Sequence, residues 1–163
     1  LGVHFALSAD EVAKLWAIRN KEDRVAFVQE ELEEAYFAEQ QHWSCETDKA
    51  WDAIHRALTN GRMEYTNGEF PLSHVILGGE VMSGDYYIMS LKTPEEVQAI
   101  AAALGEISED KLRARYFSID PDDYGLPVDE EDFKYTWHWF QKLCDLYRRA
   151  AACGRFVLFT ADQ

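Results

Sequence analysis

Two spacings of hydrophobic residues run along the chain, and each spacing predicts one type of element. Apolar runs with β-branched and aromatic members predict strands over residues 3–7, 86–91 and 155–160. Apolar residues three and four positions apart predict helices, whose starts are marked by capping residues such as Ser8 and Thr93. The first predicted helix begins at about residue 8, the second runs from residues 20–23 to residue 36, and the third runs from residue 47 or 48 to residue 58. Three more helices are predicted over residues 93–104, 108–117 and 130–153.

The last predicted helix, over residues 130–153, has the widest apolar face. When residues are placed at steps of 100°, its apolar side chains cover an arc of about 200°, which is more than a surface helix needs. We therefore expect this helix to be long, buried and central to the core. Its polar edge carries Lys134, Lys142, Arg148 and Arg149. We expect this edge to pack against an acidic segment of the same chain.

The order of the elements favours an α+β fold. Three helices separate the first predicted strand from the second, so the chain lacks the βαβ alternation of a parallel sheet. We expect a small mixed or antiparallel sheet that is packed against several helices and includes both ends of the chain. The sequence shows no internal repeat, low-complexity segment or convincing linker. This pattern predicts a single domain over residues 1–163.

The charge of the chain changes the list of plausible partners. The 163 residues include 30 acidic and 16 basic side chains, which gives a net charge of −14 with neutral histidines. Phosphate backbones and anionic membranes repel such a protein, so we expect neither a nucleic-acid partner nor a membrane partner.

The sequence has no apolar run long enough to cross a bilayer. An odd number of scattered cysteines is typical of a reducing compartment, so we expect a cytoplasmic location; Leu1 in place of Met leaves the natural start open.

The best candidate for chemistry lies on the helix predicted from residue 47 or 48. Asp52 and His55 are three residues apart and therefore share a face, and Asp48 lies one turn earlier. A carboxylate that orients an imidazole is the arrangement of a general base, and Trp51 or Trp43 is placed to cover a pocket beside it. The structural alternative is a solvated helix face, because no nucleophile or oxyanion motif accompanies the pair.

Metal and nucleotide sites are disfavoured. His42 and Cys45 have the spacing of a ligand pair, and His55 and His74 are further candidates, but zinc sites usually contain a second closely spaced pair. Burial as a small hydrophobic residue is the simpler role for Cys45. The glycines at 78–79 do not match a phosphate-binding loop. We therefore predict no metal and no cofactor.

Several stretches together resemble the YfbM-like family, bacterial proteins that are classified as a domain of unknown function. The resemblance is carried by D-K-A-W-D-A-I-H at residues 48–55, by P-L at 71–72, by I-L-G-G at 76–79, and by T-P-E-E-V at 93–97. It extends over residues 3–159 and implies a compact α+β fold and an intracellular bacterial protein. It supplies no catalytic residues.

The resemblance directs attention to residues 48–55 and 71–79. One interpretation is that these segments pack around a shared cleft, which would bring His74 toward His55. The alternative is that both segments are framework, with Trp51 in the core. The candidate ligand-binding residues are Trp43, Asp48, Trp51, Asp52, His55 and His74.

Three hypotheses about function follow from the sequence. The first is a non-enzymatic acidic protein that binds a protein partner, with toxin neutralisation as one form of this role. It is favoured by the charge and by the absence of a complete catalytic motif. The second is a small-molecule enzyme or ligand-binding protein that uses the Asp/His cluster around Trp51. The third is a structural subunit of a homo-oligomer.

Overall fold

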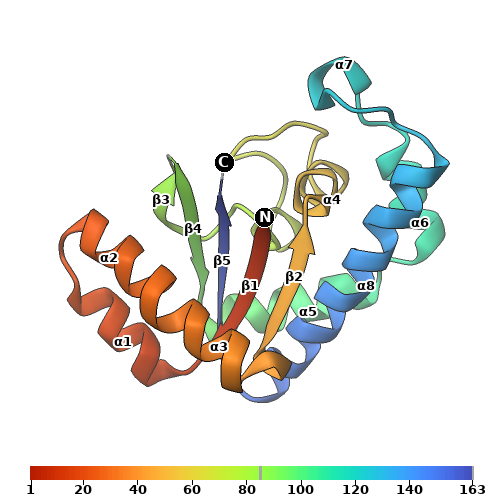
Figure 1. Cartoon of the computed structure of the whole chain (residues 1–163). Helices are drawn as coiled ribbons and strands as arrows, with labels where there is room; N and C mark the ends of the chain where they lie inside the picture. The colour runs from red at the N-terminus through yellow and green to blue at the C-terminus, as the bar shows by residue number, and fades with distance from the viewer. Residues whose placement is uncertain (85, 163) are drawn as a thin grey trace.

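A five-stranded antiparallel sheet lies at the centre of the computed structural model, which describes residues 1–84 and 86–162 (Figure 1). The strands are β1 (Gly2–Leu7), β2 (Ser44–Asp48), β3 (Glu80–Gly84), β4 (Tyr87–Lys92) and β5 (Phe156–Asp162). Their order across the sheet is β2-β1-β5-β4-β3. The two ends of the chain pair with each other in β1 and β5, in register from Gly2 opposite Ala161 to Leu7 opposite Phe156. The predicted α+β fold is confirmed, and its sheet is antiparallel.

Helices fill most of the chain between the strands, and several begin where the sequence predicts. Ser8 and Thr93 form capping boxes with the glutamates three residues later, and Ser108 accepts a hydrogen bond from the backbone N–H of Lys111. The helices are α1 (Ala9–Ala17), α2 (Lys21–Phe27), the π-helix η1 (Val28–Leu32), α3 (Glu33–Glu39), the 3₁₀ helix η2 (Gln41–Trp43), α4 (Ala50–Leu58), the 3₁₀ helix η3 (Leu72–His74), α5 (Pro94–Gly105), α6 (Glu109–Tyr116), α7 (Pro121–Tyr124) and α8 (Glu130–Ala152).

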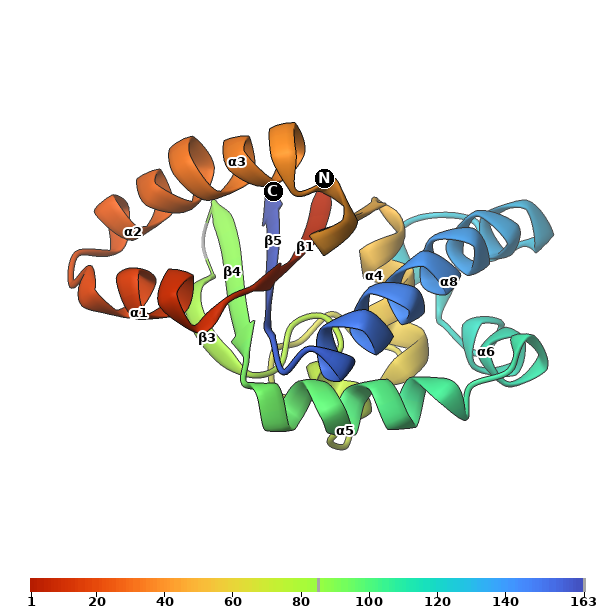
Figure 2. The ribbon, with the colours of Figure 1, turned by 90° about the horizontal axis from the view of Figure 1, so that it is seen from below.

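The sheet is covered on both faces (Figure 2). Helices α1, α2 and α3 lie on one face, and α4, α5 and α8 lie on the other. Alternate residues of β1 enter different cores: Phe5 packs toward α1–α3, whereas Ala6 packs toward α4, α5 and α8. In β5, Leu158 and Phe159 divide in the same way. This double burial explains why β1 and β4 are buried along their whole length instead of at alternate positions.

Helix α8 is the long C-terminal helix that the apolar pattern predicts, and it packs against α5, α4 and β2. Its fully buried stripe is narrower than the apolar arc in the sequence, because Trp137, Trp139 and Cys144 are only partly buried. The buried side chains are Phe133, Thr136, Phe140, Leu143, Leu146, Tyr147 and Ala150.

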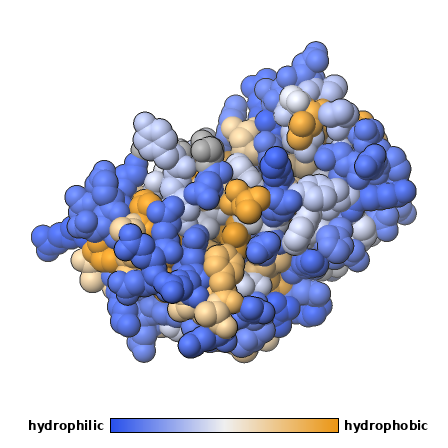
Figure 3. Space-filling view, in the orientation of Figure 1, coloured by the Kyte–Doolittle hydropathy of each residue, from blue (hydrophilic) through white to orange (hydrophobic). Residues whose placement is uncertain are grey.

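The polar edge of α8 does not pack against an acidic segment, which corrects the expectation from the sequence. Lys134, Lys142 and Arg148 are exposed. Arg148 pairs with Asp145 of the same helix at 2.8 Å. These charged groups therefore contribute to an outer surface that, on the face shown in Figure 3, is mainly hydrophilic.

Two edge strands were absent from the sequence prediction. Residues 44–48, S-C-E-T-D, form β2, where the sequence predicts a helix start at 47 or 48; the helix begins at Ala50 instead. Residues 80–84, E-V-M-S-G, form β3. Both segments contain few apolar residues, and each pairs with a single neighbour at an edge of the sheet. Pairing with a neighbouring strand therefore sets their conformation more than local propensity does.

Residues 75–78 run through the interior without joining the sheet, and buried side chains bind their carbonyl groups. His4 and Tyr147 donate hydrogen bonds to the carbonyl of Val75, at 3.3 and 2.7 Å. Lys92 Nζ donates to the carbonyl of Ile76 at 2.5 Å. Ser90 Oγ lies 2.8 and 2.7 Å from the carbonyls of residues 77 and 78. This segment is therefore fixed by side chains from β1, β4 and α8.

Acid is expected to destabilise the fold through His4. Burial lowers the pKa of His4 well below its usual value, and the nearby Lys92 ammonium lowers that pKa further. As the pH falls below about 6.5, the unfolded chain binds a proton that folded His4 does not bind, so stability is lost by about 1.4 kcal/mol per pH unit for one proton. His4→Gln removes this titration and keeps an N–H donor near Val75. Urea unfolding of both proteins at several pH values between 5 and 8 is expected to give a flatter acid limb for the variant; parallel limbs would contradict this assignment.

Candidate functional site

The candidate residues Asp52 and His55 both lie on α4, but they bind different partners. Asp52 accepts a hydrogen bond from Arg56 Nε at 2.6 Å, one turn along the same helix. Burial raises the pKa of the Asp52 carboxyl, and the ion pair with Arg56 opposes that effect. Asp52 therefore compensates the charge of Arg56, and in the described part of the chain it makes no hydrogen bond to His55.

His55 is 1% exposed and holds the loop that follows α4. Its Nε2 lies 2.9 Å from both the Glu64 carbonyl and Asn67 Oδ1. Because both partners are acceptors, Nε2 carries a proton and donates it. Burial lowers the pKa of His55, which favours the neutral form of the ring. The Asn67 amide in turn donates to Asn60 Oδ1 at 2.5 Å and to the Arg62 carbonyl at 2.8 Å.

Asp48 and Trp51 join the start of α4 to its surroundings. Asp48 has a φ of 46°, and its carboxylate accepts a hydrogen bond of 2.6 Å from the Tyr135 hydroxyl of α8. The Trp51 ring lies 5.5 Å from that of Phe159, measured between centroids. A Cβ at Gly2 would lie 2.5 Å from Trp51 Cδ1, so the strand passes close to this ring.

Trp43 and His74 lie in other surroundings. The guanidinium of Arg155 lies 4.0 Å from the centre of the Trp43 ring, a cation–π contact. His74 Nδ1 is 3.0 Å from Ser73 Oγ, and His74 Nε2 is 3.9 Å from Glu96. The described partners of His74 are thus different from those of His55. The structure places Trp51, Asp52 and His55 on α4 and the other three candidates on other segments. The ligand-binding role of all six stays a prediction.

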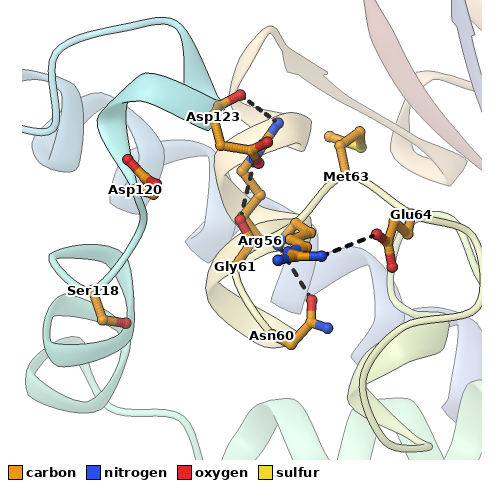
Figure 4. A pocket seen from close by; sticks show the side chains of 9 residues that line it. Arg56, Asn60, Gly61, Met63, Glu64, Ser118, Asp120 and Asp123 are labelled. Carbon is orange, nitrogen blue, oxygen red and sulfur yellow. Dashed lines mark hydrogen bonds and ion pairs between the residues drawn. The ribbon is translucent and has the colours of Figure 1, made fainter.

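A cavity of about 400 Å³ lies where α4 ends (Figure 4). The loop after α4 forms one wall through Asn60, Met63 and Glu64, and the segment that joins α6 to α7 forms the other through Ser118 and Asp120. The hydrogen bonds of His55 and Asn67 shape the first wall, because they fix the loop over residues 60–67.

Arg56 forms the base of this cavity and is only 6% exposed. Besides Asp52, it donates hydrogen bonds to the Asp123 carboxylate, to the Asp123 carbonyl at 3.3 Å and to the Gly61 carbonyl at 3.1 Å. Two carboxylates thus offset one buried guanidinium, and the ion pair with Asp123 attaches α7 to α4. Sequence spacing did not reveal this contact, because Arg56 and Asp123 are 67 residues apart.

The walls of the cavity carry more acid than base. Three carboxylates, those of Glu64, Asp120 and Asp123, and two guanidinium groups, those of Arg56 and Arg62, line it. Asp123 pairs with Arg56, and Glu64 lies 3.9 Å from the largely exposed Arg62. The adjoining segment is also strongly acidic: residues 120–132 contain seven carboxylates and no basic residue. The site therefore favours a cationic group over an anionic one.

A family model described as "Domain of unknown function (DUF1877)" matches residues 1–160. The chain belongs to the DUF1877 family. This match confirms the predicted YfbM-like resemblance, because the protein also resembles a solved member of that kind. YfbM from Escherichia coli, a protein of unknown function with a crystal structure, is 20% identical in sequence to this DUF1877 protein. The structural alignment covers 98% of each chain and has a TM-score of 0.68. At this identity the likeness shows the fold alone. No curated protein matches the chain.

Two further observations concern residues 1–84 and 86–162 of the DUF1877 protein. No group of three or more His, Cys, Asp or Glu side chains in these ranges is arranged to hold a metal ion. No helix in the same ranges combines the length and apolar character needed to cross a membrane.

Arg56→Met is expected to lower the free energy of unfolding by about 2–3 kcal/mol, because it leaves Asp52 and Asp123 without their shared cation. The value lies below that for a fully buried pair, because both carboxylates are partly exposed. Arg62→Met is the matched control: its exposed ion pair predicts a change within about 0.5 kcal/mol. Urea unfolding at pH 7 measures both, and equal losses for the two variants would show that the Arg56 ion pairs are not structural.

Proposed function

We propose that this DUF1877 protein is a non-enzymatic binding protein that takes a basic protein partner at the cavity beside α4 and α7. The observation that carries the proposal is the acidic wall of this cavity. Glu64 and Asp120 come from separate segments and meet at one opening of about 400 Å³, which has room for a lysine or arginine side chain of a partner. The ordered ion pairs of Arg56 hold the opening in shape.

The segment around α7 supports a protein partner over a free cation. Leu126 is 50% exposed and Phe117 is 43% exposed, close in the sequence to the carboxylates that line the cavity. In Figure 3 this part of the surface, at the upper right, shows a small hydrophobic spot surrounded by hydrophilic side chains. An apolar contact surrounded by charge is typical of a protein interface. Electrostatic attraction would speed the encounter with a basic surface.

The arrangement of α4 favours binding over catalysis. His55 Nε2 binds the loop over residues 60–67, and the Asp52 carboxylate accepts a hydrogen bond from Arg56. Neither group is therefore placed to transfer a proton to a molecule in the cavity. Neutralisation of a basic toxin is a specific form of the proposed role. The small-molecule and homo-oligomer hypotheses stay predictions.

The proposal also places the protein in the bacterial cytoplasm. The solved relative comes from a bacterium. Cys45, Cys144 and Cys153 are free thiols, which suits a reducing compartment.

Neutralising two wall carboxylates is expected to weaken binding of the partner. In the double variant E64Q/D120N, the cavity loses two negative charges while the Arg56 ion pairs remain. Affinity purification from the source cell and mass spectrometry are expected to recover a basic partner. When this partner is titrated, its affinity for the variant is expected to be lower than for the native protein by at least about tenfold, and its affinity is expected to fall with added salt.

The control for this experiment is E95Q/E106Q, which makes the same change in net charge at two exposed positions, one in the first turn of α5 and one directly after its last residue. This control is expected to bind the partner as the native protein does. Equal weakening by both double variants would reduce the effect to net charge, and unchanged binding in E64Q/D120N would exclude the cavity as the docking site.

A further inference from the structure

The polar edge of α8 gathers positive charge on a strongly acidic protein, and part of it lines a second cavity. This cavity, of about 340 Å³, lies between α8 and the edge strand β2. Lys142 and Arg149 line it from α8, and Cys45 and Glu46 line it from β2. It is lined by none of the residues that line the acidic cavity beside α4 and α7.

Neither cation in this second cavity is paired with a carboxylate in the described part of the chain. Lys142 Nζ lies 4.3 Å from the centre of the Trp139 ring, which holds the ammonium beside the cavity. Arg149 donates one hydrogen bond of 2.9 Å to the His42 carbonyl, and its Nε is buried without a partner. A guanidinium has five N–H donors, so this contact leaves most of its capacity unused.

One of the two carboxylates that line the cavity, that of Asp145, is already in an ion pair. It pairs with Arg148 at 2.8 Å. Burial raises the pKa of the Cys45 thiol to about 12; Lys142 and Arg149 oppose this shift, and Glu46 and Asp145 add to it. The cavity therefore combines two available positive charges with an aromatic wall.

We infer that the cavity between β2 and α8 is a binding site for a small monocarboxylate. A carboxylate would supply the acceptors that Lys142 and Arg149 lack, in the charge-assisted geometry that guanidinium and ammonium groups favour. The exposed carboxylate of Glu46 lies on the same wall and repels a second negative charge. A monoanion is thus favoured over a phosphate dianion. This inference does not rest on the proposed function, because the two sites lie on different parts of the surface.

Benzoate is a suitable probe, with benzamide as its uncharged analogue of the same shape. In titrations of ¹⁵N-labelled protein at constant ionic strength, benzoate is expected to cause saturable shifts of the amide resonances of Cys45 and Trp139. Benzamide is expected to cause none, and inorganic phosphate is expected to bind more weakly than benzoate. Lys142→Gln and Arg149→Gln are each expected to weaken benzoate binding by about tenfold, the loss of one charge-assisted bond.

Arg148→Gln is the matched control, because this exposed residue of α8 does not line the cavity; it is expected to retain benzoate binding within about twofold. Lys142 is exposed, so its variant tests the site even if the Arg149 variant loses stability. The inference is overturned if benzoate causes no saturable shift, if benzamide binds equally well, or if Lys142→Gln leaves the affinity unchanged. Tighter binding of phosphate than of benzoate would overturn the assignment to a monocarboxylate.

Discussion

The fold depends on how residues 75–78 are accommodated between the sheet and α8. This segment lies in the interior, yet it makes no strand pairing, so its carbonyl groups need donors from side chains. A buried carbonyl without a donor costs about 1–3 kcal/mol, and four such groups would cost a large share of the stability of a domain. His4, Ser90, Lys92 and Tyr147 supply those donors, and they are fully buried for this reason.

The same requirement explains why polar residues of α4 are structural. The loop over residues 60–67 has no regular pairing, and the imidazole of His55 and the amide of Asn67 bind its backbone. Arg56 extends this arrangement to α7, because its two carboxylate partners come from different segments. Side chains that would suit acid–base chemistry are thereby occupied, and the cavity that they shape is suited to recognition. Rigid walls also reduce the entropy that a partner would lose on binding.

The sequence predicts the parts of this molecule that depend on neighbours in the chain. Ser8 and Thr93 mark helix starts because their capping bonds span three residues, and the apolar spacing of α8 is equally local. Strand β2 is missing from the prediction because its pairing partner β1 is distant in the sequence, and β3, which pairs with the adjacent β4, is missing because it contains few apolar residues. The same limit applies to the site. Helical spacing correctly places Asp52 and His55 on one helix, but it contains no information on Asp123 or on the loop that binds His55.

Although the net charge of the chain is −14, acidic and basic side chains are concentrated toward opposite ends of α8, and the two cavities lie near these different ends. The first turn of this helix carries Glu130, Glu131 and Asp132, where the helix dipole favours negative charge, and Lys142 and Arg149 lie toward the opposite end. At 1.5 Å per residue, residues 130 and 142 are about 18 Å apart along the axis, which exceeds the Debye length of about 8 Å at physiological ionic strength. The acidic and basic surfaces therefore act almost independently in salt. A protein that is acidic overall can thus present a local site for an anion at one end of α8 and a site for a basic surface at the other.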